Sequence, residues 1–299
     1  MFRKSTKVNR PSSDQWLERI LIIFMLFIAA IMLYPLLVVL STSFSSPSAV
    51  TSGKVWLFPV DFSLEGYKAV FKTSDVLIGY RNSLFYMVVG TTLNVCMTLL
   101  AAYPLSRDDL VGRGIIMKLF TFTMIFSGGM IPNYLLLKDL NMLNTRWAMI
   151  LPGAISAYNM IITRTFIKSN IPKDMLEAAQ LDGCSDIQYF FKIVLPLSGA
   201  VIAVITLYYA IAHWNSYFDA FMYLNDKELY PLQVFLKNIL VSNQVQADMI
   251  VDEQVQAIEG IAEVLKYSLS VVAVVPVMII YPFVQKHFVK GVMIGAVKG

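Results

Sequence analysis

Residue types that could do chemistry are scarce in this chain and gather in two segments. Among 299 residues there are only two histidines and two cysteines, too few for a typical zinc site. The sequence has no GxxxxGK[ST] phosphate loop, no HExxH pair and no GxSxG turn. We therefore predict no catalytic residues, no metal ligands and no bound cofactor, and we expect that the chain is not an enzyme.

The first segment, residues 171–199, reads IPKDMLEAAQLDGCSDIQYFFKIVLPLSG. Residues 173–181 are rich in helix formers. Gly183 is a natural left-handed stop for that helix, and Ser185 with Gln188 fits a capping box that begins a second one. The sequence therefore predicts two short helices that meet at a glycine corner. Their apolar side chains are suited to a groove in a partner protein.

The second segment, residues 213–226, reads HWNSYFDAFMYLND. Sugars bind by stacking on aromatic rings and by pairing their hydroxyl groups with polar side chains. A carboxylate near a membrane span is costly unless it faces water or a partner, which draws attention to Asp219. An aromatic belt at the membrane interface is the alternative for the rings, and a simple span end is the alternative for Asp219. The candidates for a substrate pathway are Trp214, Asn215, Tyr217, Phe218, Asp219 and Tyr223.

The elements that carry these segments are membrane spans. Hydrophobic residues make up 57% of the chain and charged residues 15%, and a helix needs about 20 apolar residues to cross a bilayer. Uncharged runs predict an all-α membrane protein with six transmembrane helices. The third run is interrupted by glycine and proline, and the fourth is short. The runs cover residues 20–40, 83–106, 119–137, 147–163, 193–218 and 267–285.

The first run is too long for the apolar region of a signal peptide, which is the alternative to a retained helix. With six crossings, four segments lie on the same side of the membrane as the amino terminus, and lysine and arginine are enriched in all four. Because such enrichment marks the cytoplasmic side, both termini are predicted to be cytoplasmic. The formal charge of +4 is too small to suggest nucleic-acid binding. The predicted organisation is a tail (1–19), a membrane domain (20–290) with a long cytoplasmic loop (164–196), and a second tail (291–299).

That loop resembles the EAA signature of ABC importer permeases. The family pattern is EAA, three residues, Gly, nine residues, Ile, one residue and Leu-Pro, and every spacing matches here. The usual aspartate before the glycine is present. Cys184 stands where alanine is common, and Gly199 stands where a second proline is common. The matching residues are Glu177, Ala178, Ala179, Asp182, Gly183, Ile193, Leu195 and Pro196.

The resemblance implies a type I ABC importer permease fold in a bacterial cell membrane. It implies that the loop is a coupling helix, which sits in a cleft of a separate ATPase subunit that uses ATP and Mg²⁺. The implied partners are a second homologous permease, two ATPase subunits, an extracytoplasmic solute-binding protein and membrane lipid. Residues 213–226 and the closing KGVMIGAVKG (290–299) are similar to carbohydrate permeases like the second permease of the maltose importer, and in particular to those for alginate or pectin fragments.

Three alternatives stay open at this point. An ABC permease for a non-sugar solute would keep the architecture and change the cargo. An ion-coupled secondary carrier would need intramembrane carboxylates and, often, internal repeats, whereas the first four runs and the sixth contain no aspartate or glutamate. A membrane scaffold or sensor would explain the spans but not the EAA spacing.

Overall fold

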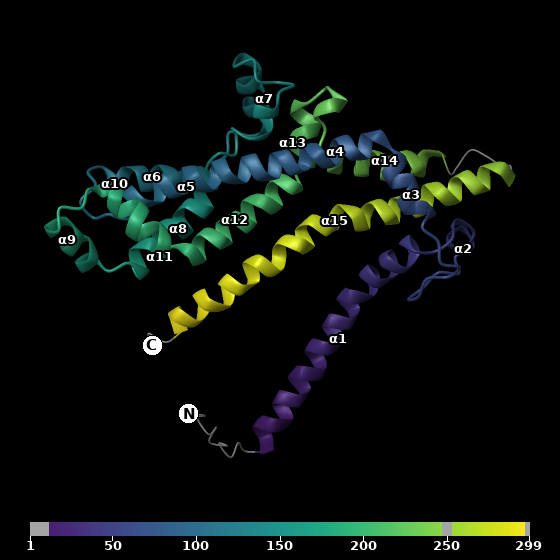
Figure 1. Cartoon of the computed structure of the whole chain (residues 1–299), viewed down its shortest axis with the longest axis horizontal. Coiled ribbons are helices and arrows are strands. Elements are labelled where there is room, and N and C mark those ends of the chain that lie inside the picture. Colours follow the sequence, from purple (N-terminus) through teal and green to yellow (C-terminus); the bar gives the residue numbers. More distant parts are fainter. Residues whose placement is uncertain (1–11, 247–252, 297–299) are drawn as a thin grey trace. The chain divides into compact units, whose positions relative to one another are not determined.

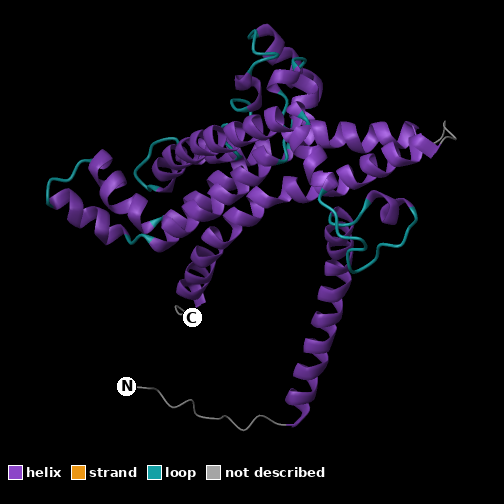
Figure 2. Cartoon of the chain, turned by 45° about the vertical axis from the view of Figure 1, so that its right-hand side comes forward, coloured by secondary structure: helices purple, strands orange, loops and turns teal. Residues whose placement is uncertain are grey.

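The structure is a computed structural model that describes residues 12–246 and 253–296, and within these residues it contains helices and loops without strands (Figures 1 and 2). The predicted all-α class is thereby confirmed for the described part. The α-helices are α1 (Ser12–Ser43), α2 (Pro47–Thr51), α3 (Glu65–Lys72), α4 (Ser74–Phe85), α5 (Thr91–Ser106), α6 (Arg113–Ile125), α7 (Met130–Asp139), α8 (Ala157–Asn170), α9 (Lys173–Leu181), α10 (Asp186–Tyr189), α11 (Leu195–Leu197), α12 (Gly199–Trp214), α13 (Tyr217–Tyr223), α14 (Leu232–Gln246) and α15 (Glu253–Ala296). Shorter or wider helical turns are η1 (Tyr86–Gly90), η2 (Arg146–Met149), η3 (Phe190–Val194) and η4 (Lys227–Leu229).

The described residues form two compact units. The first unit takes its described residues from Met1–Val70 and Asn243–Val272. Its helix α1 leaves nearly all of its apolar side chains exposed up to residue 36. The loop after α2 folds back on the end of α1, where the Ser41 hydroxyl donates to the Leu57 carbonyl over 2.7 Å. A helix with so much exposed apolar surface needs lipid or another chain to cover it.

The second unit takes its described residues from Phe71–Ser242 and Ala273–Gly299. Here α5, α8 and α12 pack against one another, and α9 and α10 lie at one end of this group (Figure 1). The core at that end joins side chains of α5 and α8 to side chains of the two-helix segment, including Ala179, Tyr189 and Phe190. The loop between the fourth and fifth predicted spans is therefore anchored to the helix ends rather than loose.

Three helices of the described part are long and apolar enough to cross a membrane: Trp16–Ser43, Ser74–Ser106 and Gly260–Pro282. They overlap the first, second and sixth predicted runs. Two further pairs of helices, each bent at a short break, raise the number to five if each pair makes one crossing.

The bent pairs coincide with the third and fifth predicted runs. Arg113–Ile125 and Met130–Asp139 meet at 114°, and Gly129 between them has φ +87°, which only glycine adopts readily. Asp186–Leu197 and Gly199–Trp214 meet at 79°. The second break, at residue 198, follows Pro196 by two positions.

The fourth predicted run, 147–163, does not form a single helix. It contains the end of η2, an irregular stretch with Pro152 and Gly153, and then α8, which begins only at residue 157. The Ser156 side chain caps α8 by accepting from the Asn159 N–H over 3.4 Å. Proline lacks an N–H and glycine costs entropy in a helix, so this apolar run breaks at its centre. Residues 1–11 and 297–299 of the predicted tails lie outside the described residues.

Candidate functional site

The turn between α9 and α10 is built by backbone hydrogen bonds around Gly183. The Cys184 N–H donates to the Ala179 carbonyl over 2.9 Å, and the Gly183 N–H donates to the Gln180 carbonyl over 3.0 Å. This is the Schellman arrangement, and it requires the left-handed conformation that Gly183 adopts at φ +76°. The predicted glycine stop is confirmed. Pro172, which the sequence favours as the first helical residue, is instead the N-cap of α9, and the helix begins at residue 173.

The second helix begins as predicted. The Ser185 hydroxyl accepts from the Gln188 N–H, and the Gln188 side chain accepts from the Ser185 N–H, each over 3.3 Å. The capping box is therefore confirmed. After one turn the helix widens into the π-helical turn η3, which buries Phe190 and leaves Phe191 exposed.

The residues of the EAA pattern divide into an inward and an outward set. Ala179 is buried, and Ile193 and Leu195 are half-buried, all in the core that joins this segment to α5 and α8. The outward set is exposed and is flanked by exposed apolar side chains such as Leu181 and Ile187. It consists of Glu177, Ala178, Asp182, Gly183 and Pro196.

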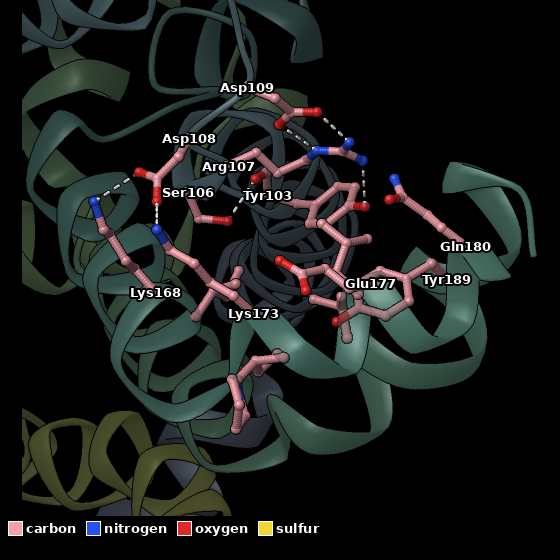
Figure 3. Close-up of a pocket in the computed structure, with 15 residues that line it drawn as sticks. Tyr103, Ser106, Arg107, Asp108, Asp109, Lys168, Lys173, Glu177, Gln180 and Tyr189 are labelled. Carbon is pink, nitrogen blue, oxygen red and sulfur yellow. Dashed lines mark hydrogen bonds and ion pairs between the residues drawn. The ribbon is translucent and has the colours of Figure 1, made fainter.

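An ion-pair network, which we call the anchor cluster, holds the segment in place (Figure 3). Asp108 follows α5 and pairs with Arg113 of α6, with Lys173 of α9 and, over 3.0 Å, with Lys168 of α8. Its other members connect the end of α5 to the first turn of α10. They are Arg107, Asp109 and Asp186, and Arg107 forms an ion pair with each of the two aspartates. The consecutive residues Arg107 and Asp108 thus connect α6, α8, α9 and α10.

The three cations around Asp108 hold the pKa of its carboxyl well below the usual range; the largest contribution comes from Arg113, followed by Lys173 and Lys168. A depressed carboxyl pKa stabilises the fold above the ordinary pKa, and the stabilisation is lost as pH falls through the lowered value. The anchor cluster therefore remains charged across the neutral and mildly acidic range.

A cavity of about 330 Å³ lies between the anchor cluster and α9. Figure 3 shows Arg107 and Tyr103 on one side of it, with Glu177, Gln180 and Tyr189 on the other. Glu177 makes no hydrogen bond or ion pair with any described residue. Its carboxylate therefore remains available to a group from outside this chain.

We expect Asp108→Asn to loosen the helical segment, because one carboxylate serves three cations there. The midpoint of thermal unfolding in detergent should fall by a few degrees at most, since the pairs are partly exposed. The difference from wild type should shrink at high salt and should be the same at about pH 5 as at neutral pH. Asp174→Asn, in α9 next to Lys173 but outside the cluster, is the matched control. An equal effect of the two variants would contradict the anchoring role.

A second cavity, which we call the polar cavity, has a volume of about 390 Å³. It lies among α5, α7, α8, α12, α13 and the irregular stretch before α8. Of the predicted pathway residues, Asp219 and Tyr223 line it. Its other polar lining residues are Asn94, Asn133, Ser156, Asn159, Tyr208, Tyr209, His213 and Ser216.

The remaining predicted pathway residues lie elsewhere. Trp214 is 1% exposed, and its indole N–H donates to the Ala273 carbonyl over 2.9 Å. The exposed Asn215 donates from its amide to the Ile211 carbonyl over 3.0 Å. The Lys237 ammonium nitrogen lies over the Tyr217 ring, 4.2 Å from the ring centre, and Phe218 is exposed. The structure therefore does not bring all six residues to one site.

Sequence reasoning missed most of the polar cavity. Asn94, Asn133 and Asn159 lie within the second, third and fourth apolar runs, and none of them is among the predicted pathway residues. A signal was available, because an amide inside an apolar run is costly unless it finds a partner or faces water. The anchor cluster was missed as well, since lysines and arginines were used only to orient the spans.

The long apolar helices define the class as a polytopic membrane protein, and its capped helix pair leaves one face exposed. A family model described as "binding-protein-dependent transport system inner membrane component" matches residues 8–294. The chain therefore belongs to this family of ABC transporter permeases.

Similar proteins include the polygalacturonan/rhamnogalacturonan transport system permease protein YtcP of Bacillus subtilis, which is 45% identical and aligns over 92% of this chain and 96% of its own length. Protein LplC of the same organism is 39% identical, with 93% of each chain covered. A solved bacterial ABC transporter "involved in the import of the acidic polysaccharide alginate" contains a chain with TM-score 0.84 and 34% identity; the match covers 94% of this chain and all of that one. The predicted type I importer permease fold is confirmed.

Proposed function

We propose that this chain is one of two permease subunits of an ATP-driven oligosaccharide importer. The single observation that carries this proposal is the helix pair at residues 173–194. It combines the EAA spacing with a turn that presents Glu177 and Ala178 outward while Ala179 packs inward. Two ATPase subunits, which use ATP and Mg²⁺, bind this segment from the cytoplasm, and a solute-binding protein delivers the cargo from outside.

The outward face of the segment supports docking to another protein. Exposed apolar residues such as Leu181, Ile187 and Phe191 flank the exposed Glu177. A partner groove that accepts this face would bury the apolar side chains and pair the carboxylate with a basic or polar group. The anchor cluster and the inward alanine make the segment move with α5 and α8, so a displacement by the ATPases reaches the helices behind it.

The cargo is inferred from the relatives. The names of the similar permeases refer to polygalacturonan, rhamnogalacturonan and alginate, which are all polysaccharides. We propose fragments of such polymers as the class of substrate. Asp219 and Tyr223, which line the polar cavity, remain the candidate pathway residues of this chain, whereas Trp214, Asn215, Tyr217 and Phe218 do not line it.

We further propose six crossings, with tails 1–19 and 291–299 and the 164–196 loop in the cytoplasm. Single cysteines placed in each predicted loop, in a chain that lacks Cys96 and Cys184, test this topology. Reagents that cannot cross the membrane should label residues 41–79 and 225–266 in intact cells. They should label the 164–196 loop only after lysis. Labelling of that loop in intact cells would contradict the topology.

Reconstitution tests the function directly. The chain is co-expressed with its partner permease and ATPase, placed in nanodiscs and supplied with the solute-binding protein. We expect ATP hydrolysis to rise when the binding protein carries an oligosaccharide and to stay at its basal rate with the empty protein. Failure of the ATPase to co-purify, or hydrolysis indifferent to the loaded binding protein, would overturn the proposal.

A further inference from the structure

The polar cavity is framed by side chains that bond to one another. The Asn94 amide donates to the Gly153 carbonyl, so its oxygen accepts from His213 Nε2 at 3.2 Å. The Tyr209 hydroxyl accepts from the Ser156 N–H over 3.0 Å and forms a hydrogen bond with the Thr98 hydroxyl over 2.7 Å. These bonds tie α5 and α12 to the irregular stretch before α8. The side chains of Asn94, Thr98, Tyr209 and His213 therefore use hydrogen-bonding groups within the protein and form a fixed frame around the cavity.

Other lining side chains have no such bonds. Asn159 is only 5% exposed, yet its side-chain amide makes no hydrogen bond with any described residue. The side chains of Asn133, Tyr208, Asp219 and Tyr223 line the same space and are likewise unpaired within the described part. Buried polar groups are normally satisfied. Asn159 and Tyr223 are buried, whereas Asn133, Tyr208 and Asp219 are exposed. The two buried side chains therefore indicate water or a polar ligand in the cavity, and the three exposed ones leave their polar groups available to it.

The backbone around the cavity favours a ligand site as well. Pro152 and Gly153 interrupt an apolar run and line the cavity. Irregular backbone inside a membrane protein is tolerated where it is buried in protein or lines a polar cavity, and interrupted apolar segments often mark binding sites.

Charge limits what the site can accept. Asp219 is the only charged residue among the described residues that line the cavity, and no lysine or arginine accompanies it. A carboxylate accepts hydrogen bonds from hydroxyl groups, amides both donate and accept, and the Tyr208 ring offers a stacking surface. An anionic sugar acid would meet Asp219 with no cation to offset the repulsion.

We propose that the polar cavity binds one uncharged, hydroxyl-rich sugar unit of the transported oligosaccharide and disfavours units that carry a carboxylate. This inference rests on the proposed function and makes it more specific. Among the polymers named for the relatives, rhamnogalacturonan alone contains neutral units, so the inference narrows the cargo to fragments of that kind. It assigns their neutral units to this subunit and leaves acidic units to surfaces outside the cavity. Asp219 sets the preference, and Asn133 and Asn159 supply the paired donors and acceptors.

Protection from alkylation tests the site. Ala212 lines the cavity and is exposed. Ala212→Cys is made in a chain with Cys96→Ala and Cys184→Ser, and the complex is reconstituted in nanodiscs. The probes are α-1,4-linked galactotriose and trigalacturonate, which differ only in the carboxylates at C6. Galactotriose should slow maleimide labelling in a saturable manner, and trigalacturonate should not. The two sugars are compared by the concentration that gives half-maximal protection. Adding Asp219→Asn should reduce the ratio of these two concentrations by roughly tenfold.

Asp139→Asn removes an exposed carboxylate of α7 that does not line the cavity, and it should leave the difference unchanged. Protection by neither sugar, or better protection by trigalacturonate, would overturn the inference. ATP hydrolysis by the same nanodiscs is measured with loaded and empty binding protein. If ATP hydrolysis rises with the loaded binding protein but galactotriose does not slow labelling, only the cavity assignment is rejected. If galactotriose slows labelling but ATP hydrolysis does not respond to the loaded binding protein, the cavity assignment is supported and the proposed importer function is contradicted.

Discussion

Glu177→Ala combined with Gly183→Pro should release the ATPase from the complex while the two permeases stay together. Proline fixes φ near −65°, whereas Gly183 lies at +76° and uses its N–H to donate to the Gln180 carbonyl. The Schellman turn therefore cannot form. Glu177 has no partner within the described part of the chain, so its loss costs no internal bond. We expect uptake to fall to background and the ATPase to be lost in a pull-down through the partner permease.

A matched double variant controls for general damage. Gly112 has φ +78° and no atom within 4 Å of an added Cβ, the same situation as Gly183. Asp174 is an exposed acidic residue of the same helix as Glu177. Asp174→Ala with Gly112→Pro therefore removes one carboxylate and distorts one left-handed glycine outside the turn. It should retain the ATPase. Equal retention by the two double variants would mean that the EAA match does not mark the docking segment.

Trp214→Ala should destabilise the fold more than any other change in the predicted pathway segment. Its ring is almost fully buried, lies edge-on to Tyr80 at 5.6 Å between ring centres and donates to the Ala273 carbonyl. Truncating a buried tryptophan costs about 3–5 kcal/mol. The midpoint of thermal unfolding in detergent should fall by several degrees, with less protein recovered.

Phe218→Ala provides the comparison, because Phe218 lies four residues later and is 55% exposed. It should leave the unfolding midpoint close to that of wild type. Trp214→Phe should fall between the two, since it keeps most of the ring and loses the hydrogen bond. If Trp214→Ala were as stable as Phe218→Ala, the packing role would be wrong and a direct role in the pathway would be favoured.

Local patterns predicted local structure well. The helix at 173–181, the left-handed Gly183 and the Ser185–Gln188 capping box all depend on neighbours in the chain, and all are confirmed. The same reasoning fails for 147–163, where the apolar composition predicts one span although Pro152 and Gly153 lie near its centre. Apolar composition measures transfer into lipid, and it does not register where the backbone must leave the helix.

The polar cavity required tertiary information. Asn94, Asn133 and Asn159 come from three different helices, and nothing in their spacing indicates that they face one space. Aromatic residues clustered in sequence, such as Trp214 and Phe218, were easier to notice, yet one is core and the other surface. The anchor cluster shows the same limit, because Asp108 meets Lys168 and Lys173 across some 60 residues.

The 79° break after the helical segment has a mechanical consequence. The helical stretch 186–197 and α12 form an elbow, with the exposed Ile187 and Phe191 on one arm and the Tyr208, Tyr209 and His213 wall of the polar cavity on the other. Because the arms are nearly perpendicular, a thrust along the first arm is received by the second almost entirely as a sideways displacement. A push along the first arm can therefore displace this wall of the polar cavity without α12 having to slide along its own axis.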